Sequence, residues 1–438
     1  MTARQAALIS LERCRRDGAW SSAAIDGAIR GNSLERRDAA LATALTLCVL
    51  QNKKYIDFII DSFCTTRANR LEKKVLDLLR LGVAQLLFFS RIPPRAAVNE
   101  TVALCASAGV ARASSLVNAV LRRISGSLEE LPEVPGKGSA EYLSTRYSHP
   151  LWLAEKLCTE KGYDFTEALF RCNNMPSALD VQINTLRTDP ESFTRSLRKA
   201  DIEYEIPPFP AGCVSIAGGA VRALPGYEGG EFFVQDRAAR MAVEIAGIEP
   251  GMDVLDACAC PGGKSFAAAI DMCDKGSVLS CDISEKKLSL VEDGAKKLGI
   301  SCISTQRRDA RTPAAELEGR FDVVIADVPC SGFGVIGKKP EIRDKNAADI
   351  AALPAIQSAI ISNVSRFVKR GGILLYSTCT ILREENEDII HAFLDASDEF
   401  EPVDYLVSGR SSERGCYTFY PNIDGTDGFF TAKLRRKE

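Results

Sequence analysis

The segment DVLDACACPGGKSFAAAIDMCDKGSVLSCDIS, residues 253–284, decides the fold. It opens and closes on short apolar runs, DVLDACA and GSVLSCDIS, which have the length of strands. Between them, GGKSFAAAIDM reads as a helix that begins at a glycine turn. A strand, a helix and a second strand in this order predict two parallel strands joined by a crossover helix.

The same alternation continues towards the end of the chain. The helix EKKLSLVEDGAKKLG, the strand FDVVIADVP, the helix LPAIQSAIISNVSRFV and the strand GGILLYSTC follow one another. Apolar runs separated by amphipathic helices are typical of a parallel sheet with helices on both faces. We therefore expect residues 229–438 to form an α/β domain with a doubly wound, Rossmann-like sheet.

Two further segments precede this domain. Residues 1–128 repeat apolar side chains at three- and four-residue intervals, which predicts an all-helical domain with a break at Pro93 and Pro94. Residues 125–139 are rich in Gly, Pro, Ser and Glu and read as a linker. Residues 138–228 mix helices with short strands and predict a small α+β module.

Several helical faces of the first segment carry basic side chains. They are either a solvated surface, which the sequence favours slightly, or a face that contacts phosphates. The residues are Arg67, Arg70, Lys73, Lys74, Arg80, Arg91, Arg95, Arg122 and Arg123.

The composition is that of a soluble globular protein, with 46% hydrophobic and 26% charged residues among 438. No apolar run approaches the roughly 18 to 20 residues that a membrane helix needs, so we expect a cytoplasmic protein without membrane contact. Fifteen cysteines are scattered singly, only two histidines occur, and there is no C-x-x-C pair. This pattern predicts neither a disulfide framework nor a metal site.

Acidic residues follow several of the predicted strands. Asp256 and the glycine turn follow the first strand, Asp282 ends the second about 20 residues past that turn, and Asp309 follows a third. In a doubly wound sheet, ligands bind at the carboxyl ends of the strands. The turn is neither G-x-G-x-x-G nor a phosphate-binding loop, so the ligand is a nucleoside without a polyphosphate. S-adenosyl-L-methionine fits this arrangement.

Two cysteines, Cys330 and Cys379, follow the strands FDVVIADVP and GGILLYSTC. Each alone reads most simply as inert packing, but both point to the end of the sheet where the methyl donor is expected. Cytosine C5 becomes nucleophilic when a thiolate adds to C6, and a base must later remove the C5 proton. Two thiols and the nearby Asp327 match these needs, although this chemistry alone does not decide which thiol attacks.

Four carboxy-terminal motifs resemble those of the RNA 5-methylcytosine methyltransferases of the RsmB/Sun class. These motifs are DACACPGGKS, DVPCSGFGVIGKKPEIR, YSTCTILREENE and DGFFTAKL. The amino-terminal stretches IPPRAAVNETV and LVNAVLRRI resemble a NusB-like RNA-binding domain. The resemblance covers nearly the whole chain and implies a class I methyltransferase domain, preceded by an all-α NusB-like domain and a small α+β module for RNA binding or linkage.

The resemblance also implies a role for each site residue. Cys379 would be the nucleophile, Cys330 would assist product release, and Asp327 would border the donor and contact the cytosine. Asp282 would bind the donor's ribose and Asp309 its adenine. The methionine end would lie on the loop Cys258, Ala259, Cys260, Pro261, Gly262, Gly263 and Lys264.

Two departures from the family pattern are side-chain changes of modest size: Cys260 replaces an alanine, and Val328 replaces the alanine of D-A-P-C. A third is Asp344, which follows Arg343 where relatives often have an aromatic residue, so RNA contacts there are less certain. Gln235 and Asp236 match a family element that supports the donor site.

The resemblance implies methylation of C5 of a cytosine in small-subunit rRNA, cytosine 967 of 16S rRNA. The expected partner is unassembled or early-assembly 16S rRNA, with no DNA, and the protein is expected to be a monomer that acts in rRNA processing. Two alternatives stay open. One is a methyltransferase for another RNA cytosine, such as a tRNA site, and the other is a NusB-like RNA-binding factor without catalysis.

Overall fold

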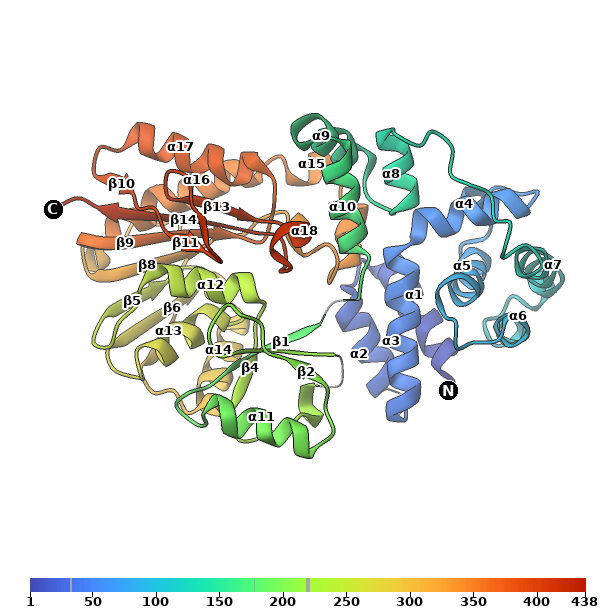
Figure 1. The fold of residues 1–438 in the computed structure, drawn as a ribbon, viewed down its shortest axis with the longest axis horizontal. Helices are drawn as coiled ribbons and strands as arrows, with labels where there is room; N and C mark the ends of the chain where they lie inside the picture. The colour runs from blue at the N-terminus through green and yellow to red at the C-terminus, as the bar shows by residue number, and fades with distance from the viewer. Residues whose placement is uncertain (32–33, 177, 218–220) are drawn as a thin grey trace. The chain divides into compact units, whose positions relative to one another are not determined.

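The structure is a computed structural model that describes residues 1–31, 34–176, 178–217 and 221–438. It contains two compact units (Figure 1). Unit 1 consists of Met1–Met175 with Ile336–Ala347, and unit 2 consists of Pro176–Val335 with Ala348–Glu438. The second segment of unit 1 therefore comes from the middle of the expected α/β sequence.

Among its described residues, unit 1 contains helices, turns and loops and no strand, as the sequence predicts for residues 1–128. Its helices are α1 (Ala3–Asp17), α2 (Ser21–Arg30), α3 (Arg36–Gln51), α4 (Lys53–Phe63), α5 (Lys73–Phe88), α6 (Pro94–Ser107), α7 (Ser114–Ser125), α8 (Ala140–Arg146), α9 (Leu151–Lys161) and α10 (Tyr163–Asn173). Short 3₁₀ turns lie at η1 (Ala68–Arg70), η2 (Ala111–Ala113) and η6 (Pro340–Asp344).

Local chemistry sets where these helices begin and end. Thr2 and Gln5 form a capping box at the start of α1, and Gly18 in the left-handed region ends the helix. Pro94 is the first residue of α6, so the predicted break after α5 is confirmed. All residues of α5 from Val75 to Gln85 are buried, which makes this helix the centre of the unit.

The basic faces of these helices are not uniform. Arg80 is buried and donates to Asp57 at 2.7 Å and to Asp77 at 3.3 Å, so this member of the basic set is an internal ion pair. Neither the favoured interpretation, a solvated surface, nor the alternative of a phosphate contact holds for Arg80. Arg67 and Arg70 are exposed around η1.

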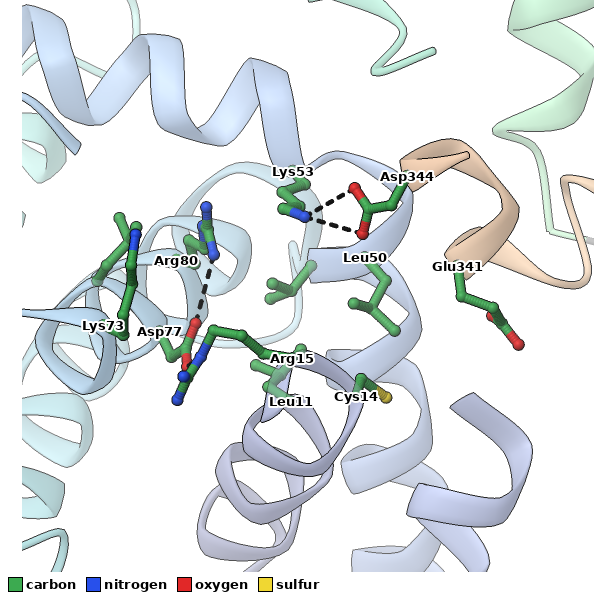
Figure 2. A pocket seen from close by; sticks show the side chains of 12 residues that line it. Leu11, Cys14, Arg15, Leu50, Lys53, Lys73, Asp77, Arg80, Glu341 and Asp344 are labelled. Carbon is green, nitrogen blue, oxygen red and sulfur yellow. Dashed lines mark hydrogen bonds and ion pairs between the residues drawn. The ribbon is translucent and has the colours of Figure 1, made fainter. Parts of the chain in front are cut away.

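A cavity of about 310 Å³ opens among α1, α3, α5 and η6 (Figure 2). Leu11, Val49, Leu50 and Leu76 give it apolar walls. Its charged groups are largely paired with one another, because Arg15 donates to Asp77 at 2.9 Å and Lys53 to Asp344 at 2.8 Å. The cavity is therefore a mixed-charge hollow of unit 1, whereas both candidate thiols belong to unit 2.

The segment 336–347 is anchored to unit 1 by a buried arginine. Arg343 donates to the carbonyls of Tyr147 at 2.8 Å and Ser148 at 3.1 Å, and to Asn174 Oδ1 at 2.6 Å. Burial lowers the pKa of Arg343 to about 9. Arg343 is only 6% exposed, so this residue of the KKPEIR motif holds the chain in place.

The main sheet of unit 2 has the strand order β10-β14-β9-β8-β5-β6-β7, with β13 paired to β14. The strands are β5 (Asp253–Asp256), β6 (Ser277–Asp282), β7 (Ile303–Arg307), β8 (Phe321–Asp327), β9 (Val368–Thr378), β10 (Phe400–Pro402), β13 (Cys416–Phe419) and β14 (Phe429–Arg436). The five strands from β5 to β9 are parallel, which confirms the predicted doubly wound fold.

Helices cover both faces of this sheet (Figure 1). They are α12 (Arg237–Ala246), α13 (Gly263–Asp271) and α14 (Glu285–Leu298) on one face, and α16 (Leu353–Val364) and α17 (Glu387–Ala396) on the other. Successive residues of β8 alternate between the two cores: Val323 and Ile325 pack with α12–α14, whereas Val324 and Ala326 pack with α16 and α17. This two-sided burial explains why the strand sequence is continuously apolar.

The carboxy-terminal edge of the sheet departs from the all-parallel prediction. β14 runs antiparallel to β9, and β10 and β13 run antiparallel to β14. The tail DGFFTAKL thus returns as a strand beside β9 rather than as a crossover unit. Its apolar residues are those of any buried strand, and direction cannot be read from them.

A smaller antiparallel sheet of unit 2 has the order β2-β3-β1-β4. Its strands are β1 (Leu179–Ile183), β2 (Tyr204–Glu205), β3 (Cys213–Ile216) and β4 (Phe232–Val234), and α11 (Pro190–Lys199) accompanies them. Asp189 caps α11 by accepting from Ser192 N, with Pro190 at the first position. The remaining elements are η3 (Val221–Ala223), η4 (Ala315–Leu317), η5 (Phe333–Val335), α15 (Ala347–Ile350), η7 (Ser365–Phe367), η8 (Arg383–Glu385), β11 (Leu406–Val407), β12 (Arg410–Ser411) and α18 (Pro421–Asp424).

One described stretch, Ala347–Phe367, is long and apolar enough to cross a membrane by length and composition, with a mean hydropathy of 1.3. This corrects the expectation that no run comes near that length. The stretch includes α16, whose buried Gln357 and Asn363 donate to the carbonyls of Pro329 and Ala310. These bonds, and its packing in the sheet's core, identify it as a covering helix of unit 2.

Candidate active site

The two thiol loops leave the carboxyl ends of adjacent parallel strands. In the register of β8 and β9, Asp327 lies opposite Ser377. Cys330 follows three residues after Asp327, and Cys379 follows two residues after Ser377. The register therefore brings both predicted cysteines to one point at the edge of the sheet.

The two sulfur atoms lie 3.2 Å apart, within hydrogen-bonding distance for thiols. The backbone N–H of Cys379 also donates to Cys330 Sγ at 3.3 Å. The hydrogen bond to Cys379, together with burial and the charges of Glu385 and Asp327, raises the pKa of the Cys330 thiol well above its ordinary value. Cys330 therefore keeps its proton at neutral pH and can donate it towards Cys379.

Asp327 is held at the same strand end by two partners. Lys264 Nζ lies 2.7 Å from Asp327 Oδ2, and Ser377 Oγ donates to Oδ1 at 2.9 Å. Lys264 is buried and its ammonium lies 5.0 Å from the centre of the Phe429 ring. Because Lys264 starts α13, this pair ties the glycine loop to the thiol loops.

The glycine loop presents backbone to whatever lies over it. Gly262 has φ +110°, and a Cβ there would come within 2.5 Å of the Phe266 ring. No side chain caps the helix α13 that follows, so its first N–H groups have no side-chain acceptor and remain available as donors. Such a helix start suits the carboxylate of a methionine moiety, so the residues present fit the expected donor.

The two cysteines of the glycine loop differ chemically from an activated nucleophile. Burial raises the pKa of Cys258 well above its usual value and that of Cys260 to about 12, with nearby acids adding to the effect. Neutral thiols of this kind are weak nucleophiles. The proton that each of these thiols keeps makes Cys258 and Cys260 poor candidates for a nucleophile.

Asp256, at the end of β5, is fully buried beneath this loop. Ser265 Oγ donates to its Oδ2 at 2.7 Å, whereas Oδ1 is buried with no hydrogen-bond partner among the described residues. Burial raises the pKa of Asp256 to about 6. Its side chain braces the start of α13 from inside the sheet.

Asp282 and Asp309 lie at the ends of β6 and β7, next along the sheet. Asp282 Oδ1 accepts from Ser284 N at 2.8 Å. Asp309 is paired with Arg311, whose guanidinium lies 2.6 Å from Oδ2 and lowers the pKa of that carboxyl. A ligand amine at Asp309 would share the carboxylate with Arg311.

Gln235 and Asp236 support the site from behind. The buried Gln235 side chain would lie 3.3 Å from a Cβ at Gly263, so it backs the glycine loop. Asp236 caps α12 through Ala238 N at 2.8 Å and accepts from Asp427 N at 3.3 Å. It thereby joins α12 to the DGFF tail.

Comparison with known proteins gives the family. The sequence model described as "16S rRNA methyltransferase RsmB/F" matches residues 245–435, that of the NusB family matches residues 1–126, and an RsmF/B ferredoxin-like domain matches residues 149–220. A Bacillus subtilis protein named "Probable ribosomal RNA small subunit methyltransferase B" is 33% identical over 99% of this chain and 98% of its own. The chain belongs to the 16S rRNA methyltransferase RsmB/F family.

Other relatives agree with this membership. The Citrobacter koseri "Ribosomal RNA small subunit methyltransferase B" is 32% identical over 92% of this chain and 91% of its own. A solved structure titled "Crystal Structure of PH0851" superimposes with a TM-score of 0.83 at 26% identity, over 99% of this chain and 98% of that one. NSun6 from Pyrococcus horikoshii shares the fold, with a TM-score of 0.58 at 18% identity over 69% of this chain and 98% of that one.

Membership confirms the resemblance and the fold class that the sequence predicts, a methyltransferase domain after a NusB domain. The structure also shows residues near the two thiols that were not recognised from the sequence. Glu385, Gln357, Ser331 and Ser377 all bond within or beside the two thiol loops. The sequence signal that could have pointed to Glu385 is the acidic run REEN, shortly after the second thiol. In that run a buried glutamate cannot be told from its more exposed neighbours.

Proposed function

We propose that the protein transfers a methyl group from S-adenosyl-L-methionine to C5 of a cytosine in 16S rRNA, cytosine 967, through a covalent bond between Cys379 and C6. The observation that carries the proposal is the pair of thiols 3.2 Å apart beside the Asp327–Lys264 ion pair. A simple RNA-binding factor needs neither of them.

The electron flow assigns a task to each thiol. The Cys379 thiolate forms a bond to C6, and the C5–C6 π electrons move to C5, which takes the methyl group while the donor's sulfur keeps the electrons of the broken S–CH₃ bond. Removal of the C5 proton by a base then restores the C5–C6 double bond and expels Cys379. Cys330, whose raised pKa keeps it protonated before reaction, supports the sulfur of Cys379 and assists this release.

Asp327 and Lys264 order the two substrates. Lys264 keeps Asp327 in place by a 2.7 Å ion pair, so the carboxylate stands at the strand end where donor and cytosine are to meet. Addition of the thiolate makes the ring negative, so a proton or hydrogen bond supplied to N3 stabilises it, and we assign that contact with the cytosine to Asp327. The loop 258–264, Asp282 and Asp309 hold the methionine, ribose and adenine parts of the donor in the proposal.

The remaining segments take the roles that the family suggests. We assign residues 1–128 to RNA binding, 138–228 to an RNA-binding or linking module and 229–438 to catalysis. In the proposal the substrate is 16S rRNA before or early in assembly, the protein acts as a monomer, and it works in the cytoplasm, which the rRNA methyltransferase names of its relatives support.

A trapping gel tests the chemistry. Wild type, Cys379→Ala and Cys330→Ala are each incubated with 16S rRNA and S-adenosylmethionine and run under denaturing conditions. An RNA-linked band that accumulates only with Cys330→Ala supports attack by Cys379, whereas a band only with Cys379→Ala reverses the roles. Cys302→Ala, at a half-buried thiol before β7, is the matched control and should behave as wild type.

Two further readouts separate the alternatives. Methylated positions are mapped on free 16S rRNA, assembled small subunits and bulk tRNA, and modification of cytosine 967 in free rRNA is expected. Methylation of tRNA alone would favour the other RNA target. Thermal stabilisation by S-adenosylmethionine is expected, and its absence together with no methylation would favour the non-catalytic binding factor.

A further inference from the structure

A buried carboxylate joins the two thiol loops. Glu385 ends η8, six residues after Cys379, and is only 1% exposed. Its Oε2 accepts from Ser331 N at 2.9 Å and from Gln357 Nε2 at 2.9 Å. Ser331 is the residue next to Cys330, so a side chain of the second loop holds the backbone of the first.

The residues on both sides of Cys330 in the chain are held by hydrogen bonds. Gln357 Nε2 also donates to the carbonyl of Pro329 at 3.0 Å, on the other side of the thiol. Ser331 Oγ lies 2.8 Å from Thr380 Oγ1 of the second loop. The residues on both sides of Cys330 are thus bound, directly or through Gln357, to Glu385 and the Cys379 loop.

Glu385 is itself rigidly placed. Tyr376 on β9 is fully buried and donates its hydroxyl to the carbonyl of Glu385 at 2.7 Å. The backbone of Glu385 is therefore fixed to the sheet.

The charge of Glu385 is unusual for a packing residue. Its Oε1 is buried with no hydrogen-bond partner among the described residues, and the two donors to Oε2, Ser331 N and Gln357 Nε2, are neutral. A glutamine of the same shape would avoid the cost of burying a carboxylate without a cation. A carboxylate that is kept despite this cost is expected to act through its charge, and the nearby group on which the charge of Glu385 acts is Cys330.

We propose that Glu385 is a positioning residue of the methyl transfer, which holds Cys330 against Cys379 and places a carboxylate beside the two thiol loops. This inference rests on the proposed function for its link to catalysis. The Glu385 charge is one of the causes that raise the pKa of Cys330, after the Cys379 hydrogen bond and burial.

Alkylation of Cys330 tests the charge without RNA. The protein carries Cys379→Ser in both arms, with and without Glu385→Gln, and iodoacetamide labelling at pH 8.5 is followed by peptide mass spectrometry. We expect Glu385→Gln to speed labelling of Cys330 about three- to tenfold, because removing a nearby charge lowers the thiol pKa by about half a unit to one unit. Labelling of the exposed Cys273 is the internal reference and should not change.

Turnover tests the link to catalysis. With Cys379 intact, Glu385→Gln should lower kcat about 10- to 100-fold while the KM for RNA changes less than about twofold. Glu385→Asp keeps the charge and should leave Cys330 labelling near that of its parent, so it decides the matter if Glu385→Gln folds poorly. Glu384→Gln, one residue earlier and half-exposed, is the matched control and should leave kcat and labelling unchanged.

The outcomes separate this inference from the proposed function. Unchanged labelling in Glu385→Gln, or a kcat that falls only in proportion to the folded fraction, overturns the role of Glu385 even if Cys330→Ala traps RNA. Faster labelling with no trapped RNA in any variant keeps the effect on Cys330 but overturns the proposed function.

Discussion

At the scale of single residues, the site depends on one short distance. The Cys330 and Cys379 sulfurs are 3.2 Å apart, and the carboxylates of Asp327 and Glu385 stand beside them. Two cysteines that the sequence places 49 positions apart therefore act as one chemical group. At this distance a proton held by Cys330 can form a hydrogen bond to the sulfur of Cys379.

This proximity predicts a redox sensitivity. A mild thiol oxidant, such as an azodicarboxamide, should take one hydrogen from each thiol and join the two sulfurs as a disulfide, with loss of methylation. Dithiothreitol should restore activity. Peptide mass spectrometry should find Cys330 linked to Cys379, and a dominant link between any other cysteines would contradict the geometry.

A second prediction concerns Asp282, at the end of β6. Asp282→Asn should weaken binding of S-adenosylhomocysteine about 10- to 100-fold, because a hydrogen bond to a charged group contributes about 1.5 to 3 kcal/mol. Isothermal titration calorimetry measures this affinity. Asp293→Asn, on α14, is the control, and equal affinities of the two variants would remove Asp282 from the donor site.

At the scale of elements, backbone hydrogen bonds of two glycines connect three of the family motifs. Gly334 N donates to the carbonyl of Cys379 at 3.0 Å, and Gly428 N donates to the carbonyl of Gly334 at 2.9 Å. The SGFG loop, the thiol loop after β9 and the DGFF tail before β14 meet there. A Cβ on Gly334 would clash with the Gly428 carbonyl oxygen and lie 2.9 Å from that of Cys379.

Gly334→Ala should therefore displace the Cys379 loop. We expect a loss of about 1 to 3 kcal/mol in the free energy of unfolding and at least a tenfold loss of turnover. Chemical denaturation and methylation assays measure both. Gly229→Ala is the control, because the nearest atom to a Cβ at Gly229 would be 3.5 Å away, and it should have little effect. Similar losses in both variants would contradict the role of the Gly334 contacts.

At the scale of the whole molecule, unit 1 contains a buried histidine beside its anchored segment. His149 stacks on Phe170 with ring centres 3.7 Å apart, and its Nδ1 lies 2.8 Å from the carbonyl of Tyr147. Burial, followed by the charges of Arg343 and Lys54, lowers the pKa of His149 well below its ordinary value. His149 is therefore neutral in the folded protein.

The stability of unit 1 should fall in mild acid for this reason. Below about pH 6.5 the unfolded chain takes up a proton that the folded chain refuses, so unfolding becomes easier as the pH falls towards the depressed folded pKa. Between pH 7.5 and 5.5 this contributes a loss of about 1.4 kcal/mol.

Chemical denaturation of wild type and His149→Gln at the two pH values isolates the effect. Other groups, such as Asp256, titrate equally in both proteins and cancel in the difference. The variant should be less stable at pH 7.5 but lose about 1.4 kcal/mol less on acidification. An equal loss in both proteins would show that His149 does not carry the effect.

The sequence predicted the parallel strands, their covering helices and the cysteines and acids at their ends, because these follow from local apolar periodicity. It could not predict that β14 runs antiparallel beside β9, or that residues 336–347 belong to unit 1, since both depend on contacts between distant segments. Arg80, Arg343 and Glu385 were misread or missed for the same reason. A charged residue looks the same in sequence whether it faces solvent or a buried partner.

The central claim is that Cys379 attacks the cytosine, and the most direct measurement identifies the linked atom. RNA trapped on Cys330→Ala is digested with nuclease and protease, and the nucleotide-bearing peptide is sequenced by mass spectrometry. The account predicts a methylated cytidine on the peptide that contains Cys379. A nucleotide on a peptide with any other cysteine, or only unmodified Cys379 in trapped material, would contradict it.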